Sequence, residues 1–457
     1  MLDIVQDQGE AAPGAPQPSP PAGAEEHRGQ PELSRKGFIT AYPMFRYWNK
    51  EAVAEGLRPQ PLNLYIHMPY CIQRCAYCYF KTTTLKENRL KDIDRYVTAV
   101  CKELALGSQL FGLMKRPVET VYFGGGTPTL MSEENLDRLF AALHENFTLA
   151  DPQITFEGEP VTLTERKAAV LQRHNVNRIS LGIQSFKEEI VFQTGRQDTE
   201  EQAMKAIELA KSTGAEVNVD LISGLAGETP ETWAYSVRRA IEADVHNITI
   251  YKLELYANTP YYSAERHNEI ALPGEEEELA FIKYAVAELK RHDYHPVNTF
   301  TFTKGGGHDQ LNTRNRWLGY DSFACGVSAY GSLGTWNYQN TNDINGYIDS
   351  VEKGELPAFR GYQCSGFDLI ARDVVMGIKL IDLSHVRFRA KHGIDLLKVC
   401  EGALSQLAQE GFVTVDDENI SLTDHGVIYG DYVGRILEGS LKRWSGASSD
   451  SRARVRF

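Results

Sequence analysis

The feature that most constrains the fold is a regular alternation of short strands and amphipathic helices through the middle of the chain. Strands are predicted at Val118 to Phe123, Ile154 to Glu157, Arg178 to Ile183, Glu216 to Ile222 and Asn247 to Leu253, with helices at Ser132 to Asn146, Thr164 to His174, Glu200 to Thr213 and Glu231 to Ala243 between them. Such alternation predicts parallel strands joined by right-handed crossovers. We therefore predict an α/β fold, a partial or full TIM-type (β/α) barrel with its chemistry at the carboxyl ends of the strands.

Three cysteines lie before this alternation. The mostly apolar run Leu62 to Met68 predicts a buried strand that Pro69 ends, and Cys71, Cys75 and Cys78 follow in a CxxxCxxC pattern. Thiolates so close together suit a soft metal or an iron–sulfur cluster. Tetrahedral zinc normally takes four ligands, and no further Cys or His follows here. Three ligands on a four-iron cluster leave one iron open; three structural thiols, or zinc completed from a distant residue, are the alternatives.

A run of three glycines, Gly124 to Gly126, ends the next predicted strand and leads into Thr127-Pro128-Thr129. Glycines at a strand end allow positive φ and a close approach of the backbone to a ligand. A triple glycine by itself is equally compatible with a tight turn.

Polar residues stand at or near the ends of three further predicted strands, namely Glu157, Gln184 and Asp220. A buried polar group without a partner costs roughly 1–3 kcal/mol, so each of these residues needs a partner or a ligand. Each residue taken alone fits a hydrogen-bond network inside the barrel. Together, near the carboxyl ends of successive strands, they predict one shared cavity.

The residues YIHMPYC (65–71) and CAYC (75–78) resemble the radical S-adenosylmethionine (SAM) superfamily, and in particular its coproporphyrinogen dehydrogenase-like branch. The segment GGGTPT (124–129) resembles the glycine element of the same family. This resemblance implies a [4Fe–4S] cluster held by Cys71, Cys75 and Cys78, with SAM on the open iron. It also implies a second SAM molecule and an electron donor such as flavodoxin or ferredoxin.

The resemblance further assigns contacts to the two SAM molecules, residue by residue. It implies that Tyr65, Tyr77, Gly125 and Glu157 contact the first SAM, and that Gly126, Thr127, Gln184, Arg196 and Asp220 contact the second. It assigns no general base.

Two departures from the family patterns bear on function. Coproporphyrinogen dehydrogenases carry another Cys two residues after the third ligand, where this chain has Phe80. The related haem chaperones carry HNxxYW, of which the segment 312–317 keeps only Trp317. The sequence then most resembles the class C radical SAM methyltransferases.

That resemblance implies that two SAM molecules serve to methylate an sp² carbon, or to begin cyclopropane formation on it. The substrate would be a small aromatic or conjugated molecule such as a quinone, an indole or another natural-product ring. An oxygen-independent coproporphyrinogen III oxidase-like decarboxylase and a haem-trafficking protein are the alternatives.

Length and composition set the remaining expectations. A chain of 457 residues predicts two folded units plus tails: residues 1–35 as a Pro/Ala/Gly-rich disordered tail, 36–355 as the barrel domain, 356–440 as a small C-terminal domain and 441–457 as a mobile tail. The C-terminal domain is predicted to be α+β and winged-helix-like, and it resembles the small domain of the same family. A net charge of −13 argues against nucleic-acid binding. We also expect no membrane span and a cytoplasmic location.

Overall fold

The computed structural model describes residues 61–85 and 90–446. The predicted N-terminal tail, residues 1–35, and residues 447–457 of the predicted C-terminal tail lie outside the described residues. The domain boundaries given above stay predictions. Within the described ranges, no helix combines the length and the apolar character that crossing a bilayer requires.

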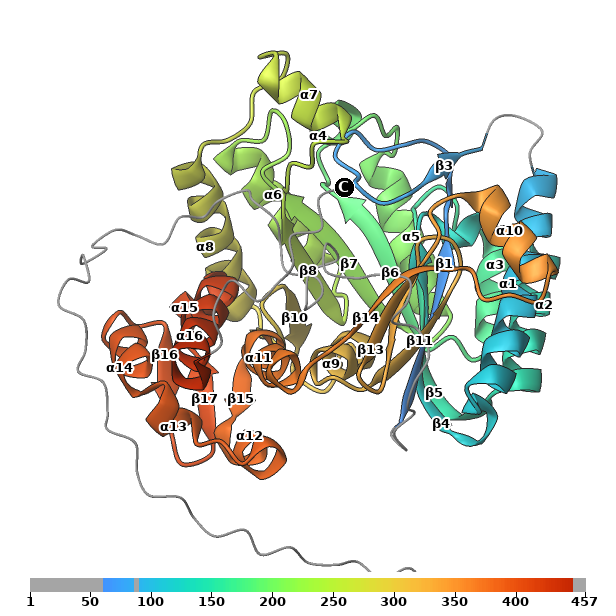
Figure 1. The fold of residues 1–457 in the computed structure, drawn as a ribbon. Helices are drawn as coiled ribbons and strands as arrows, with labels where there is room; N and C mark the ends of the chain where they lie inside the picture. Colours follow the sequence, from blue (N-terminus) through green and yellow to red (C-terminus); the bar gives the residue numbers. More distant parts are fainter. Residues whose placement is uncertain (1–60, 86–89, 447–457) are drawn as a thin grey trace, which may run out of the picture. The chain divides into compact units, whose positions relative to one another are not determined.

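The centre of the structure is a twelve-stranded sheet curved into a partial barrel (Figure 1). Six parallel strands follow one another: β1 (Leu62–Met68), β4 (Pro117–Gly125), β5 (Thr148–Gly158), β6 (Arg178–Gln184), β7 (Glu216–Ser223) and β8 (Asn247–Lys252). On the other side of β1, β11 (Asp321–Cys325) is also parallel to it. The predicted parallel α/β barrel is thus confirmed, in its partial form.

Antiparallel strands extend both edges of the sheet. β10 (Thr301–Lys304) and β9 (Tyr294–Pro296) follow β8, while β12 (Tyr330–Leu333), β13 (Trp336–Asn340) and β14 (Ala358–Gln363) follow β11. The turn-like composition of residues 299–308 predicts a loop, and this prediction is wrong for residues 301–304, which form β10. Tertiary pairing overrides the local signal, because Thr301, Phe302 and Thr303 align with Thr249, Ile248 and Asn247 of β8.

Helices cover the outer face of the parallel strands. They are α1 (Leu90–Leu110), α2 (Glu133–Asn146), α3 (Glu165–Arg173), α5 (Glu200–Ser212), α6 (Pro230–Glu242) and α8 (Glu275–Arg291), while α4 (Glu188–Gln193) and α7 (Pro260–Arg266) lie at the carboxyl ends of the strands, beside the cysteine loop. Several begin at a hydroxyl cap: Ser132, predicted to cap α2, accepts a hydrogen bond of 3.2 Å from the Asn135 N–H, and Thr164, Thr199 and Thr229 cap α3, α5 and α6 in the same way. These caps satisfy N–H groups that a helix leaves unpaired at its start.

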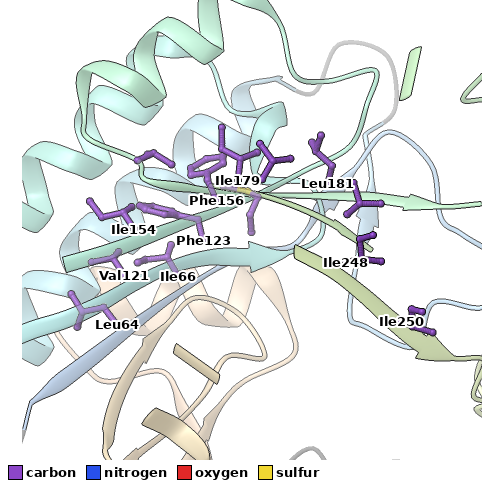
Figure 2. Packing of buried hydrophobic residues seen from close by; sticks show 14 of the residues in the cluster. Leu64, Ile66, Val121, Phe123, Ile154, Phe156, Ile179, Leu181, Ile248 and Ile250 are labelled. Carbon is purple, nitrogen blue, oxygen red and sulfur yellow. The ribbon is translucent and has the colours of Figure 1, made fainter. Parts of the chain in front are cut away.

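The hydrophobic core lies between these helices and the outer face of the sheet. Alternate strand residues point into it, and Figure 2 shows this pattern for Leu64 and Ile66, Val121 and Phe123, Ile154 and Phe156, Ile179 and Leu181, and Ile248 and Ile250. Because side chains alternate across a strand, the residues between them face the inside of the barrel. The interior is therefore lined largely by polar side chains.

Hydrogen bonds connect these inner side chains from strand to strand. Asn63 of β1 accepts from the Thr120 hydroxyl at 2.9 Å, and from Asn315 of the short helix α9 (Leu311–Trp317) at 3.0 Å. On the opposite wall, Asn218 of β7 donates to Ser180 of β6 and accepts from Thr249 of β8, both at 2.8 Å. These bonds satisfy polar groups that would otherwise be buried at a cost.

The C-terminal part is a small α+β unit, as predicted. It contains α11 (Gly366–Gly377), α12 (His385–His392), α13 (Leu396–Val399), α14 (Glu401–Gln409), α15 (Asp424–Ile428) and α16 (Gly430–Ser445) around a three-stranded antiparallel sheet of β15 (Asp382–Ser384), β17 (Asn419–Leu422) and β16 (Val413–Val415). The last helix of the described residues, α16, ends at Ser445. Buried Lys379 ties the unit to the barrel: its carbonyl accepts from the Thr299 N–H at 3.0 Å.

The core packing predicts a large effect of one aromatic substitution. Phe156 on β5 is fully buried, and its ring centre lies 5.0 Å from that of Phe123. Phe156→Ala should lower the free energy of unfolding by about 3–5 kcal/mol, because it removes apolar contacts and leaves a cavity. Urea titration followed by circular dichroism measures this loss. The matched control is Phe359→Ala on β14, where the side chain is 56% exposed; equal losses in the two variants would contradict this placement of the core.

Candidate functional site

The cysteine loop leaves the carboxyl end of β1 and is fixed at several points. Cys71 ends β2 (Tyr70–Cys71), which pairs with β3 (Thr83–Thr84), and the Cys71 carbonyl accepts from the Leu85 N–H at 3.0 Å. Further along, Ala76 donates to the Thr194 carbonyl at 2.8 Å, and the Cys78 N–H donates to the Cys75 carbonyl at 3.1 Å. The loop that carries Cys71, Cys75 and Cys78 is therefore held against β3 and the end of α4.

The three thiols are free and weakly acidic in this environment. Burial raises the pKa of Cys71 to about 12 and that of Cys78 to about 11, and it also raises the pKa of Cys75. They therefore need a bound cation to become thiolates, and a coordinated metal deprotonates thiols directly.

The donor set fits an iron–sulfur cluster with one open iron. No group of three Cys, His, Asp or Glu side chains in the described ranges already stands in metal-binding geometry, so the thiols would have to turn toward the cluster. The assignment of Cys71, Cys75 and Cys78 as ligands thus stays a prediction.

The glycine run packs directly beneath the cysteine loop. Gly126 donates to the Met68 carbonyl at 2.6 Å and Thr127 to the Tyr70 carbonyl at 2.8 Å, while the Gly125 N–H donates to Glu157 at 3.0 Å. A Cβ on Gly126 would lie 2.7 Å from the Tyr70 carbonyl oxygen and 3.0 Å from the Cys71 sulfur. Glycine is therefore required by close approach, and the N–H groups of this run are already used within the protein.

Tyr65, Gly125 and Glu157, predicted to contact the first SAM, are brought together inside the barrel. The Glu157 carboxylate accepts from the Tyr122 hydroxyl at 2.6 Å as well as from Gly125, and the Tyr65 ring stacks on Tyr122 with centres 5.9 Å apart. Burial raises the pKa of Glu157 to about 7, although the Tyr122 and Gly125 hydrogen bonds lower it. A carboxylate held in this way is suited to a cationic ligand.

Gln184, Arg196 and Asp220, predicted to contact the second SAM, meet around Gly182. Gly182 pairs with Asp220 across β6 and β7, and its carbonyl accepts from Arg196 at 2.8 Å. Gln184 has a left-handed backbone with φ of 70°. A Cβ on Gly182 would lie 2.8 Å from the side-chain nitrogen Nε2 of Gln184. Left-handed backbone at a non-glycine residue is uncommon and concentrates at functional sites.

Two atoms of this group have no protein partner among the described residues. The Gln184 side-chain oxygen and one terminal nitrogen of Arg196 are both buried without a hydrogen bond. Buried polar atoms in native proteins are nearly always satisfied, so these two indicate a missing ligand. Asp220, by contrast, accepts from Ser180 at 3.1 Å and from Asn218 at 2.8 Å.

Tyr77 lies on the cysteine-loop side of this group. Its electrostatic neighbours are Cys75 and Arg196, and its ring contacts Tyr261 edge-on at 6.3 Å. Tyr77 therefore connects the cysteine loop with the Arg196 side of the site rather than with Tyr65.

Several residues of the site were missed by sequence reasoning. Asp198 binds Arg196 at 2.6 Å, Glu159 lies beside both Arg196 and the cysteines, and Arg178 is fully buried near Glu157 and Asp220. Along the chain, each of the three lies an even number of positions from a residue predicted to contact SAM. Period-two spacing along the strand, as in Arg178, Ser180, Gly182 and Gln184, was the signal available for Arg178.

Comparison with known proteins supports the fold and the superfamily. Residues 65–240 match the family model of the radical SAM superfamily, and residues 367–429 match that of the HemN C-terminal domain. The solved coproporphyrinogen III oxidase (HemN) of Escherichia coli, described as a radical SAM enzyme, superposes with a TM-score of 0.76 at 26% identity, over 87% of this chain and 96% of that one.

Two curated relatives cover similar lengths. The heme chaperone HemW of Bacillus subtilis is 26% identical over 383 residues, 83% of this chain and 100% of that protein. The oxygen-independent coproporphyrinogen III oxidase of Escherichia coli is 28% identical over 389 residues, 80% of this chain and 83% of that protein. These matches support the superfamily and its HemN-like branch. They lend no support to the narrower prediction of a class C methyltransferase.

The cofactors of this family are a [4Fe–4S] cluster and SAM, as predicted.

We expect Cys71→Ala, Cys75→Ala and Cys78→Ala each to lose the bound iron, the visible absorption of the cluster and all SAM cleavage, because each removes one of three ligands. Iron and sulfide analysis after anaerobic reconstitution measures the loss. Cys101→Ala, a half-buried thiol on α1, is the control and should keep its iron; a Cys75→Ala variant with full iron would contradict the assignment.

Proposed function

We propose that this protein, a member of the radical SAM superfamily with a HemN-type C-terminal domain, is a hydrogen-abstracting enzyme that oxidatively decarboxylates a porphyrinogen-like substrate. The observation that carries the proposal is the set of Cys71, Glu157 and Arg196 at the carboxyl ends of the strands, within a fold shared over most of both chains with a coproporphyrinogen III oxidase. Its main competitor is the two-SAM alkylation that the departures at Phe80 and residues 312–317 suggest.

The cofactors divide the site between them in this proposal. Cys71, Cys75 and Cys78 hold the cluster, while Tyr65, Tyr77, Gly125 and Glu157 hold the first SAM. When bound, the cluster and SAM together would supply the hydrogen-abstracting chemistry, directed at a substrate held by the residues of the barrel interior. The second SAM would lie over Gly126, Thr127, Gln184, Arg196 and Asp220, where the unpartnered atoms of Gln184 and Arg196 supply hydrogen bonds.

The proposed decarboxylation balances in atoms and electrons. A carboxyethyl side chain loses one hydrogen atom from the carbon next to the ring, then carbon dioxide and one electron, and becomes a vinyl group. The hydrogen ends in 5′-deoxyadenosine, and the electron passes to an acceptor of the small redox protein class. The chain's own residues bind and orient both partners, since near-attack placement requires reacting atoms about 3–3.5 Å apart.

Two-SAM alkylation is retained as a second candidate for one specific reason. Phe80, on the cysteine loop, is an exposed aromatic side chain at the place where coproporphyrinogen dehydrogenases carry a cysteine. In that case the methyl group of the second SAM, and not the substrate, would lose the hydrogen atom. A haem-carrying role is the third possibility, given the similarity to HemW.

The raised pKa of Glu157 predicts a pH dependence for SAM binding. A carboxyl group with a pKa of about 7 is about nine-tenths ionised at pH 8 and one-tenth at pH 6, so the affinity for cationic SAM should fall as the pH drops through 7. We expect the dissociation constant to rise roughly 5–10-fold between pH 8 and 6, measured by equilibrium dialysis. Glu157→Gln should bind more weakly and without this dependence, while Glu134→Gln on the exposed face of α2 should behave as wild type. An unchanged pH profile in Glu157→Gln would exclude Glu157 as its source.

The source of the abstracted hydrogen decides between the candidate reactions. With coproporphyrinogen III deuterated next to the ring and unlabelled SAM, deuterium should appear in 5′-deoxyadenosine, together with vinyl products, by mass spectrometry. With methyl-deuterated SAM and unlabelled substrate, no deuterium should appear there. Asp220→Ala should keep the cluster and reduce vinyl product, because it weakens the second SAM site.

The opposite labelling pattern would overturn the decarboxylase proposal. Deuterium transferred from the SAM methyl group, together with S-adenosylhomocysteine, would favour alkylation. Haem binding without any 5′-deoxyadenosine would favour haem carriage.

A further inference from the structure

Arg316 is a cation inside the barrel that none of the assigned roles uses. It lies on α9, the short helix joined to β1 and β4 by side-chain hydrogen bonds, and its guanidinium stands 4.7 Å above the centre of the Tyr330 ring. Its other electrostatic neighbours are Tyr65 and Tyr122, two inward-facing tyrosines beside Glu157. Arg316 therefore reaches from the open side of the barrel toward the region of the first SAM.

No carboxylate pairs with Arg316 among the described residues. Three other arginines that are largely removed from solvent do have one: Arg116 lies 2.9 Å from Asp321, Arg196 lies 2.6 Å from Asp198, and Arg372 lies 2.9 Å from Asp373. Removing a guanidinium from water is costly unless an anion compensates. The cation–π contact with Tyr330 offsets only part of that cost, at about 1–2 kcal/mol.

Accessible side-chain surface remains inside the barrel at Tyr251. Tyr251 points inward from β8 and is 39% exposed, yet burial raises its pKa well above the usual value, because protein surrounds it on all sides. Accessible surface on a side chain so enclosed indicates a hollow within the barrel. Arg178, the other inward-facing arginine without a carboxylate partner among the described residues, is fully buried, so a ligand cannot reach it. Arg316 is half-buried, so a ligand can reach it.

Flat aromatic surfaces border this hollow on the cysteine-loop side. Tyr79, the residue after Cys78, stacks on Phe80 and Tyr256 with ring centres 4.3 and 4.2 Å apart. Tyr330 and Arg316 are among the electrostatic neighbours of Tyr79, so the stack and the guanidinium border the same space. Aromatic rings pack well against other flat rings, and a guanidinium pairs with a carboxylate through two parallel hydrogen bonds.

We propose that Arg316 is the carboxylate-binding residue for the substrate, and that the substrate is an aromatic or tetrapyrrole compound bearing a carboxylate. The ring lies against Tyr251 while the carboxylate pairs with Arg316. This placement specifies the substrate of the proposed function and so rests on it, but it concerns recognition and not the hydrogen-abstraction step. In a chain of net charge −13, a guanidinium without a carboxylate partner among the described residues is a selective anchor for an anion.

The test compares charged and uncharged probes on the full chain with its cluster reconstituted. Coproporphyrin III and indole-2-carboxylate supply the carboxylates, and the tetramethyl ester and indole-2-carboxamide are their uncharged counterparts. Wild type should bind each acid more tightly than its counterpart, by fluorescence titration. Arg316→Met should weaken at least one acid by about tenfold or more and leave the uncharged probes unchanged, with Arg316→Lys in between. The acid that responds identifies the ring class.

The matched control is Arg314→Met, an exposed arginine two positions away on the same helix, which should bind like wild type. SAM affinity and iron content should be equal in all variants. Three results would overturn the proposal: no preference of wild type for either acid, an equal loss for acids and uncharged probes, or a loss of SAM affinity in Arg316→Met. The last would mean that Arg316 holds the carboxylate of a cofactor.

The titrations measure binding without turnover, so they test the role of Arg316 independently of the proposed reaction. Arg316-dependent binding with no 5′-deoxyadenosine would overturn the proposed reaction alone. Vinyl product that forms equally well in Arg316→Met would overturn the carboxylate anchor alone.

Discussion

The structure depends on the alternation of side chains along its parallel strands. Each strand sends one set of residues outward to the helices and the other set inward, and in this chain the outward set is apolar while the inward set is largely polar. A TIM barrel usually fills its centre with branched apolar side chains. Here asparagines, threonines, tyrosines and charged residues occupy the equivalent places, so the hydrophobic core lies wholly outside the barrel and the interior is left for ligands.

A polar interior is stable only where its groups satisfy one another. Thr120, Asn63 and Asn315 do so in the lower layer, and Ser180, Asn218 and Thr249 do so on the opposite wall. Nearer the carboxyl ends of the strands this mutual satisfaction stops. Atoms of Gln184 and Arg196 lack partners there, and burial raises the pKa of Glu157 and of Asp220.

The sequence predicts the features that depend on nearby residues, but not those that depend on tertiary contacts. Local patterns predicted the parallel strands, the Ser132 cap and the cysteine loop, because each depends on nearby residues. The antiparallel strands β9 and β10 were missed, since their pairing with β8 is tertiary and their segment looks like a turn. Arg178 and Asp198 were missed for a similar reason: their roles depend on which distant charges the fold places beside them. The comparisons lend no support to the class C methyltransferase prediction, which rested on the departures at Phe80 and residues 312–317. A sequence does not show what these residues face in the folded protein.

The structure gives those two departures a common meaning. Phe80 stacks on Tyr79, and Tyr79 borders the same space as Arg316, although the two segments are more than 200 residues apart in the chain. Most residues predicted to contact SAM come from the strand ends, whereas Phe80 lies on the cysteine loop and Arg316 on the short helix α9. Substitutions on such segments alter what the hollow accepts without disturbing the strands that position the cofactors. For this reason the overall likeness to the coproporphyrinogen oxidases constrains the radical chemistry more tightly than it constrains the substrate.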